Sequence, residues 1–351
     1  MSALIRKLSR LGRQQLFWPL VALALLALFN AFFSPGFLHL EIKSGHLYGS
    51  VIDILNRAAP LMLIALGMTL VIATRGIDIS VGAVVAISAA LAAILIGGTL
   101  VIKEGVPQYV TKVPMAIAIL AALGVALLCG MWNGMLVARV GMQPIIATLI
   151  LMVAGRGVAQ LITNGQIITI YYQPYFFIGN GFLLGIPFSL YIVAAVLAVL
   201  LLLTRRTALG LFIEAVGINP TASRFSGLRS RAIIFWVYAF CGLCSGIAGL
   251  IISSNVKSAD GNNAGLLLEL DAILAVTLGG TSLTGGRFSI IGSMMGALII
   301  QTLTYTIYSI GVPPEVNLVV TSSVVFLVML LQSETFRKKL FRTSELQEFT
   351  E

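Results

Sequence analysis

Four charged side chains stand within otherwise apolar stretches of this 351-residue sequence, and two glutamines accompany them. The set is Asp78, Arg156, Glu269 and Asp271, with Gln160 and Gln301 as the uncharged members. A charge surrounded by lipid is costly, so each such residue is by default a candidate for a pathway or for a structural pair. Glu269 and Asp271 are two residues apart, so on a helix they point to different faces and are not a ready pair of catalytic carboxylates.

Other reactive groups give no catalytic pattern. His39 and His46 both fall before the second apolar stretch, where a solvated loop is expected. Cys241 and Cys244 form a lone C-x-x-C without a second pair, which favours two small core residues one helical turn apart over a metal or redox site. The H-E-x-x-H and P-loop patterns are absent, so the sequence predicts no enzyme, and any nucleotide chemistry must come from another polypeptide.

The composition explains why the charged residues matter. The chain is 58% hydrophobic and 10% charged, and its mean hydropathy is +1.02. Soluble domains are about one quarter charged. We therefore predict an all-α, polytopic integral membrane protein.

Apolar stretches long enough to cross a bilayer number about ten by a criterion of roughly 20 residues. They are 16–33, 51–74, 81–102, 114–138, 143–164, 186–204, 232–252, 269–284, 289–310 and 316–333. The eighth is short and ends in glycines, so a broken or re-entrant helix shielded by protein is the alternative to a full span. With both termini in the cytosol, most Lys and Arg residues fall in cytosolic segments, as the positive-inside rule requires. The net charge of +9 then anchors topology and calls for no nucleic acid.

The segments around the charged residues each allow two interpretations. Asp78 or Ser80 could cap the third span, with Arg75 as an ionic partner of Asp78, or the segment could form the inner mouth of a pore. Asp271 could simply favour a helix N-terminus or lie beside a water-filled path. Arg156 is expected to make a structural ion pair or hydrogen bond rather than contact substrate.

The longest cytosolic loop, 205–231, contains the signals of a short helix. Asn219 suits the N-cap, Pro220 the first helical position and Gly227 the position past the end, which predicts a helix over 220–226. Apolar residues around it, including Val216 and Ile218, predict either a protein partner or a helix lying on the lipid surface.

Several motifs resemble bacterial ABC sugar-importer permeases of the ribose type. These are Gly-Ile-Asp-Ile-Ser-Val-Gly-Ala at 76–83, Pro-Ile-Ile-Ala-Thr-Leu at 144–149, and Glu-Leu-Asp-Ala-Ile from 269 followed by Gly-Gly-Thr-Ser-Leu-Thr-Gly-Gly-Arg-Phe at 279–288. Runs at 52–60, 155–163, 212–219 and 262–269 are similar to the galactofuranose branch of that family. One departure is Arg75, where the family pattern has glycine.

The resemblance implies a single transmembrane permease domain over 1–351 in the bacterial inner membrane, with 205–231 as its coupling loop. It implies an ATPase subunit, a second permease that forms a heterodimer with this one, and a periplasmic sugar-binding protein. No cofactor is expected in this chain, because ATP and magnesium would bind the ATPase. The candidate translocation path is Asp78, Ser80, Asn133, Thr148, Gln160 and Asp271. The candidate ATPase contacts are Glu214, Val216, Gly217, Asn219 and Arg224.

A secondary sugar carrier that acts alone is the alternative. Such carriers usually need a relay of ionisable groups at mid-membrane. The few charged residues here offer little for one, so the sequence favours the ATP-driven importer.

Overall fold

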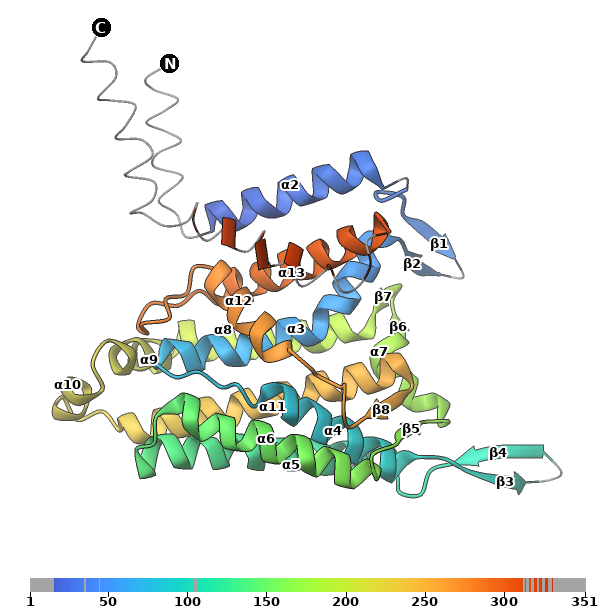
Figure 1. Ribbon diagram of the computed structural model, residues 1–351, viewed down its shortest axis with the longest axis horizontal. Helices are drawn as coiled ribbons and strands as arrows, with labels where there is room; N and C mark the ends of the chain where they lie inside the picture. The colour runs from blue at the N-terminus through green and yellow to red at the C-terminus, as the bar shows by residue number, and fades with distance from the viewer. Residues whose placement is uncertain are drawn as a thin grey trace, which may run out of the picture.

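A computed structural model describes residues 16–311 apart from 35, 44 and 104–105, together with 313, 316, 319–320, 322–323, 326–327 and 330. Its long helices lie side by side in a bundle (Figure 1). They are α2 (Phe17–Phe33), α3 (Ser50–Ala73), α4 (Val81–Ile96), α5 (Met115–Met135), α6 (Pro144–Thr163), α8 (Phe188–Arg206), α11 (Ser230–Val256) and α13 (Ile290–Ser309). The shorter helices are the π-helix η1 (Leu136–Val140), the 3-10 helix η2 (Gln173–Phe176), α7 (Phe177–Asn180), α9 (Leu209–Ile218), α10 (Pro220–Phe225) and α12 (Leu268–Leu278).

Four two-stranded antiparallel sheets gather at one end of the bundle, opposite α9 and α10 (Figure 1). Strands β1 (Glu41–Lys43) and β2 (His46–Tyr48) form one hairpin, and β3 (Thr99–Lys103) and β4 (Val106–Val110) form another. Strand β5 (Ile167–Thr169) pairs with β8 (Ser258–Asp260), and β6 (Phe182–Leu183) pairs with β7 (Ile186–Pro187). These short pairs satisfy the backbone of the loops that leave the helices.

Within the described residues, six helices are long and apolar enough to cross a membrane: α3, α5 with η1, α6, α8, α11 and α13. Helices α2 and α4 are shorter but apolar. The predicted span 81–102 is wrong at its end, because α4 stops at Ile96 and Gly97 and Gly98 both have positive φ before β3 begins. The predicted span 316–333 falls largely outside the described residues.

Helix α3 forms the centre of the molecule. In the most apolar 18-residue stretch of α3, 83% of the residues are buried inside the protein. In the corresponding stretch of α8, 17% are buried. Helix α11 packs against α3, α4 and α5, and Gly242 of α11 lies so close to α5 that a Cβ there would come 2.6 Å from the Ala126 carbonyl oxygen. Small residues thus bring these helices into backbone contact, as in other membrane bundles. Cys241 and Cys244 are free, buried core residues of α11, as predicted.

Helices α4 and α12 both begin inside the bundle. Residues 74–80 run inward from the α9 end before α4 starts (Figure 1). The loop 261–267 leads from β8 to α12 and lies against the start of α4, where a Cβ on Gly265 would come 2.6 Å from the Gly82 carbonyl oxygen. At 11 residues, α12 is about 16 Å long by the 1.5 Å rise per residue, which is half of a bilayer core of about 30 Å. The broken-helix alternative therefore describes the eighth stretch.

Candidate functional site

A buried polar cluster surrounds the start of α4. Asp78 Oδ1 accepts hydrogen bonds from the Ser80 backbone N–H at 3.0 Å, from Ser80 Oγ at 2.6 Å and from Asn133 Nδ2 at 3.3 Å. Asn133 Nδ2 also donates to Ser80 Oγ at 2.8 Å. All three side chains are buried, with Asp78 only 1% exposed. Ser80 occupies the predicted N-cap position, but its side chain makes no capping bond.

Thr148 of α6 joins the same segment from another side. Its hydroxyl accepts a hydrogen bond from the Ile79 backbone N–H at 3.3 Å. The hydroxyl also lies within donating distance of the Ile77 carbonyl, at 3.3 Å. The hydroxyl also reaches the Pro144 carbonyl at 3.0 Å. Four predicted path residues from three separate stretches of sequence therefore meet around residues 77–80.

The cluster contains a buried polar atom without a partner. Asn133 Oδ1 accepts no hydrogen bond from any residue that the structure describes. A buried unpaired polar atom of this kind costs about 1–3 kcal/mol, so its retention calls for an explanation. A water molecule or a ligand hydroxyl group is the kind of donor that would satisfy Asn133 Oδ1.

Tyr238 of α11 belongs beside this cluster, and sequence reasoning missed it. The side chain is fully buried, and its hydroxyl lies where a Cβ of Gly76 would otherwise project. The signal for this contact was a glycine just before Asp78. It could not be matched to a tyrosine more than 150 residues away without the fold.

Two of the predicted path residues lie apart from the cluster. Gln160 is exposed on α6, and Asp271 is half-buried in the first turn of α12. Glu269 is the buried carboxylate of that turn, and its Oε2 lies against Gly82 in the first turn of α4. Both acidic residues occupy a helix N-terminus, where the helix dipole favours negative charge.

Arg156 of α6 makes the structural hydrogen bond that the sequence predicted. Its Nη1 donates to the Ala264 carbonyl at 2.6 Å, which fixes the loop 261–267 against α6. The same loop is organised by Asp260, which accepts from the Asn262 N–H at 2.8 Å and from Asn263 Nδ2 at 2.7 Å. Partial burial raises the pKa of Asp260, but these hydrogen bonds outweigh it and hold the pKa below its usual value.

The predicted pairing of Arg75 with Asp78 is wrong. Arg75 adopts a left-handed conformation with φ of 62°. Its side chain turns toward the α9 end, where Nε donates to the Thr284 carbonyl at 2.9 Å and an Nη donates to the Ile218 carbonyl at 2.6 Å. Asp78 is therefore satisfied by uncharged donors alone.

The predicted short helix over 220–226 is confirmed as α10 (Pro220–Phe225). Asn219 Oδ1 accepts from the backbone N–H groups of Thr221 and Ala222, both at 3.0 Å, and Gly227 has a φ of +84° just past the end. Helix α9, which precedes it, was not predicted. Its apolar residues were interpreted only as nearby surface.

The candidate ATPase contacts divide by exposure. Val216 and Gly217 are buried against the body of the protein, so they can support a docking surface but not touch a partner directly. Asn219 and Arg224 are exposed, and Glu214 is half-buried. The prominent exposed apolar side chains are Leu211 at 67%, Ile218 at 62% and Phe225 at 89%. We define Leu211, Ile218 and Phe225 as the α9–α10 surface.

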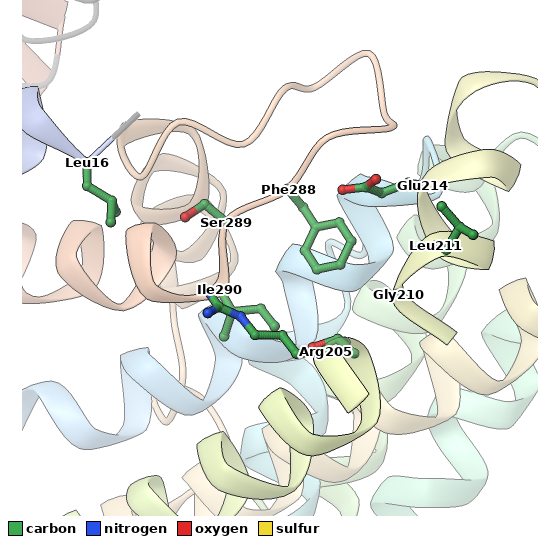
Figure 2. A pocket seen from close by; sticks show the side chains of 9 residues that line it. Leu16, Arg205, Gly210, Leu211, Glu214, Phe288, Ser289 and Ile290 are labelled. Carbon is green, nitrogen blue, oxygen red and sulfur yellow. The ribbon is translucent and has the colours of Figure 1, made fainter. Parts of the chain in front are cut away.

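A cavity of about 610 Å³ opens beside α9 (Figure 2). Glu214 and Leu211 line it on the α9 side, and Arg205 comes from the end of α8. Phe288 and Ser289 line it from the segment that enters α13. Glu214 therefore lies at the rim of a recess between α9 and the start of α13.

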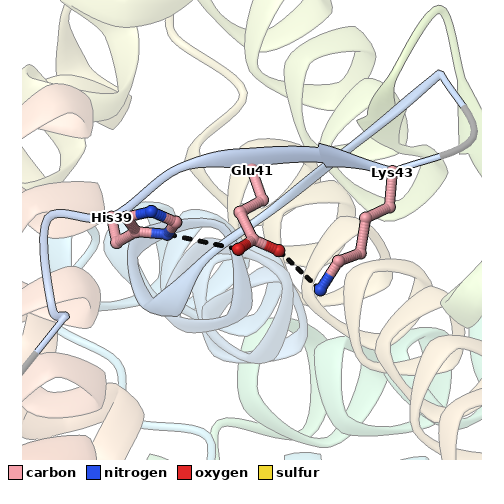
Figure 3. Close-up of polar contacts among 3 residues, drawn as sticks. All are labelled: His39, Glu41 and Lys43. Carbon is pink, nitrogen blue, oxygen red and sulfur yellow. Dashed lines mark ion pairs between the residues drawn. The ribbon is translucent and has the colours of Figure 1, made fainter.

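The opposite end of the molecule carries a surface ion cluster on β1. Figure 3 shows Glu41 between His39 and Lys43, with Glu41 Oε2 at 2.5 Å from Lys43 Nζ and Oε1 at 3.7 Å from His39 Nδ1. The hydrogen bond and charge of Lys43 lower the pKa of Glu41, and Glu41 raises the pKa of Lys43 in turn. His46, expected to be solvated, instead packs its ring 4.8 Å from that of Phe182. Surface pairs of this kind contribute little to stability, and nothing in this cluster suggests catalysis.

Comparison with known proteins gives a family. Residues 50–330 match the family described as branched-chain amino acid transport system / permease component. The galactofuranose transporter permease protein YtfT of Escherichia coli is 50% identical over 91% of both chains. The fructose import permease protein FruF of Bifidobacterium longum is 41% identical over 92% of this chain and 89% of its own length.

The ribose import permease protein RbsC of Escherichia coli is 34% identical over 90% of this chain and 92% of its own. No solved structure gave a match. The family match spans the buried cluster, α9 and α10. It also spans α4 and α12, the two helices that begin inside the bundle and that we call the broken helices. The chain therefore belongs to the permease family that is described as branched-chain amino acid transport system / permease component.

Proposed function

We propose that this chain is the permease subunit through which an ABC importer carries galactofuranose across the inner membrane. The observation that carries the sugar assignment is the 50% identity to a galactofuranose transporter permease over 91% of both chains. A fructose import permease at 41% identity makes fructose the second candidate substrate. The family and the six apolar helices make the chain a multi-pass inner-membrane protein.

The proposed topology crosses the membrane ten times and has both termini in the cytosol. The loop 261–267 and the short α12 together make the eighth crossing. The support for this topology is the distribution of arginines in the structure. Arg75 contacts the carbonyl at the end of α9, Arg205 and Arg206 end α8, and Arg224 lies in α10. By the positive-inside rule, this arginine-rich end faces the cytosol. Residues 1–351 then form one transmembrane domain, and the β-hairpins face the periplasm.

The proposed partners follow from what each face presents. The α9–α10 surface exposes large apolar side chains at the cytosolic end, and an ATPase subunit that docks there would cover them. Because the P-loop pattern is absent from the sequence, ATP and magnesium would bind that subunit. A second permease, as a heterodimeric paralogue, and a periplasmic sugar-binding protein would complete the importer.

The proposed path passes the starts of the two broken helices. Irregular backbone at membrane depth is tolerated where protein or water shields it, and transporters commonly place their sites there. Asp78, Ser80, Asn133 and Thr148 are buried, so in this conformation they would fix where α4 begins. Gln160 and Asp271 are more accessible and remain candidates for direct contact with sugar hydroxyls.

The test uses the native complex, purified through a tag on this chain and reconstituted in proteoliposomes with its sugar-binding protein. We expect ATP-dependent accumulation of labelled galactofuranose, with fructose and ribose weaker. ATP-independent uptake driven by an ion gradient, in vesicles holding this chain alone, would instead support a secondary carrier. ATP-driven uptake of fructose in preference to galactofuranose would keep the importer and overturn the sugar.

A further inference from the structure

Arg75 joins three segments at the arginine-rich end of the bundle. Its guanidinium donates to the carbonyl of Ile218, the last residue of α9, and its Nε donates to the carbonyl of Thr284 in the loop between α12 and α13. Arg75 itself begins the segment that leads to α4. One side chain thus links the end of α9, the loop after α12 and the approach to α4.

Backbone contacts reinforce the same junction. The Gly286 N–H donates to the Ala73 carbonyl at 2.9 Å. Gly217 of α9 lies against both, since a Cβ there would overlap the Ala73 carbonyl oxygen and come 2.5 Å from Gly286 N. Gly285 adopts a φ of +82° directly over the Arg75 side chain. The end of α9, the approach to α4 and the loop after α12 are therefore packed together in one junction.

The conformation of Arg75 is one that glycine adopts more readily. A non-glycine residue at φ of 62° is strained. The ribose-type permease motif that residues 76–83 resemble is preceded by glycine at this position. The side chain offsets this strain with two hydrogen bonds. Ile218 offers a carbonyl at a helix C-terminus, where backbone acceptors are left open and a positive charge is favoured.

We propose that Arg75 is a positioning residue that transmits movement of the α9–α10 surface to both broken helices, and so sets how tightly ATP hydrolysis is coupled to import. The inference rests on the proposed function, because it requires an ATPase docked at that surface. Movement passes from Ile218 through Arg75 to the segment 76–80, which holds Asp78 and the start of α4. It passes in parallel through Thr284 to the end of α12.

The planar guanidinium suits this role because its fixed donors reach two carbonyls at once, whereas a lysine ammonium on a flexible stem holds no such geometry. Lysine should therefore keep the charge and lose part of the coupling. Glycine should relieve the strain of the positive φ and remove both side-chain hydrogen bonds.

The experiment compares R75G, R75K and wild type as tagged native complexes in proteoliposomes loaded with galactofuranose-binding protein. It measures the amount of ATPase that copurifies, the rate of ATP hydrolysis and the rate of galactofuranose import. For R75G we expect normal copurification, sustained hydrolysis and a rise of about tenfold in ATP consumed per sugar imported, within the usual range for coupling between sites. R75K should give a smaller rise.

The matched control is R287A, which removes a positive charge from an exposed position in the same loop and should leave the ratio unchanged. An unchanged ratio in R75G, with wild type coupled, would overturn the role of Arg75 alone. If R75G does not accumulate, an unchanged ratio in R75K overturns the role in the same way. Wild-type protein that copurifies with no ATPase would overturn the proposed function and the inference with it.

Discussion

Asp78 is a buried carboxylate that no cation neutralises within the described residues. Its three donors come from Ser80 and Asn133, and they lie within 3.3 Å. Because Asp78 is buried, the loss of any one of these donors leaves a polar group without a partner inside the protein, which is costly. The geometry ties the start of α4 to α5 through one amide group.

Removing that amide should destabilise the fold. For N133L we expect the free energy of unfolding to fall by about 1–3 kcal/mol, because Asp78 and Ser80 each lose a buried partner. Relief of the unpaired Asn133 Oδ1 offsets part of this effect. Thermal unfolding of the purified protein in detergent measures the change.

The control for N133L is Q160L, which makes the same type of change at an exposed position of α6. Its stability should stay within about 0.5 kcal/mol of wild type, as is usual for surface substitutions. Equal melting temperatures for N133L and Q160L would contradict the importance of the cluster.

At this scale the sequence named residues that the structure brings into contact, but it did not predict the contacts themselves. Asp78 was singled out as a charge in an apolar stretch, and Ser80, Asn133 and Thr148 were named as further polar candidates for the path. Their meeting depends on how α5 and α6 pack against the segment 77–80, which no local pattern encodes. Arg75 was paired with the nearest carboxylate in sequence, and its left-handed backbone sends it elsewhere.

At the scale of elements, α9 owes its position to a glycine. Gly217 has no side chain, so the end of the helix reaches the backbone of Ala73 and Gly286. This contact brings Ile218 within reach of Arg75. A longer side chain at Gly217 would separate α9 from the rest of the junction.

We expect G217A to lower the free energy of unfolding by about 1–3 kcal/mol, since the added methyl group meets fixed backbone atoms. G157A is the matched control, because a Cβ on Gly157 of α6 meets nothing within 4 Å. Alanine there should be neutral or stabilise by about 0.5–1 kcal/mol through its better helix propensity. Chemical denaturation of both variants in the same detergent tests the pair, and similar destabilisation of both would refute the close contact.

Elements with strong local signals were predicted well. The Asn219 cap, Pro220 and Gly227 predicted the bounds of α10 to within one residue. The glycines after 278 correctly indicated that the eighth stretch is not one continuous spanning helix. Helix α9 was not predicted, because its apolar residues lie on both its buried and its exposed face and so show no helical periodicity. Residues 99–102 of β3 were included in the predicted span 81–102 because 100–102 are apolar, although Gly97 and Gly98 marked the break.

At the scale of the whole molecule, the two ends present different surfaces. One end holds short hairpins and the surface ion cluster of β1, and the other holds the α9–α10 surface (Figure 1). In the proposed topology the α9–α10 surface lies outside the bilayer, where exposed large apolar side chains favour association with a partner. Within the α9–α10 surface, the most exposed side chain is Phe225, at 89%.

We expect F225D to reduce copurification of the ATPase at least tenfold, because aromatic anchors dominate protein interfaces. The melting temperature of the permease itself should not change, since Phe225 supports nothing in the fold. S226D, a charge added to the neighbouring exposed residue, is the control and should retain most binding. Normal recovery of the ATPase with F225D would place the docking site elsewhere.

Helix α12 also constrains the order in which the protein can be made. Its 11 residues are too few to cross the bilayer core, and the loop 261–267 carries polar backbone that lipid cannot satisfy. During synthesis this stretch cannot settle in the membrane on its own. It needs to pack against the start of α4 at Gly82, which is synthesised about 180 residues earlier. The last third of the chain therefore matures only after the first third has assembled, and a defect near Gly82 would appear as a failure of biogenesis before any transport could be measured.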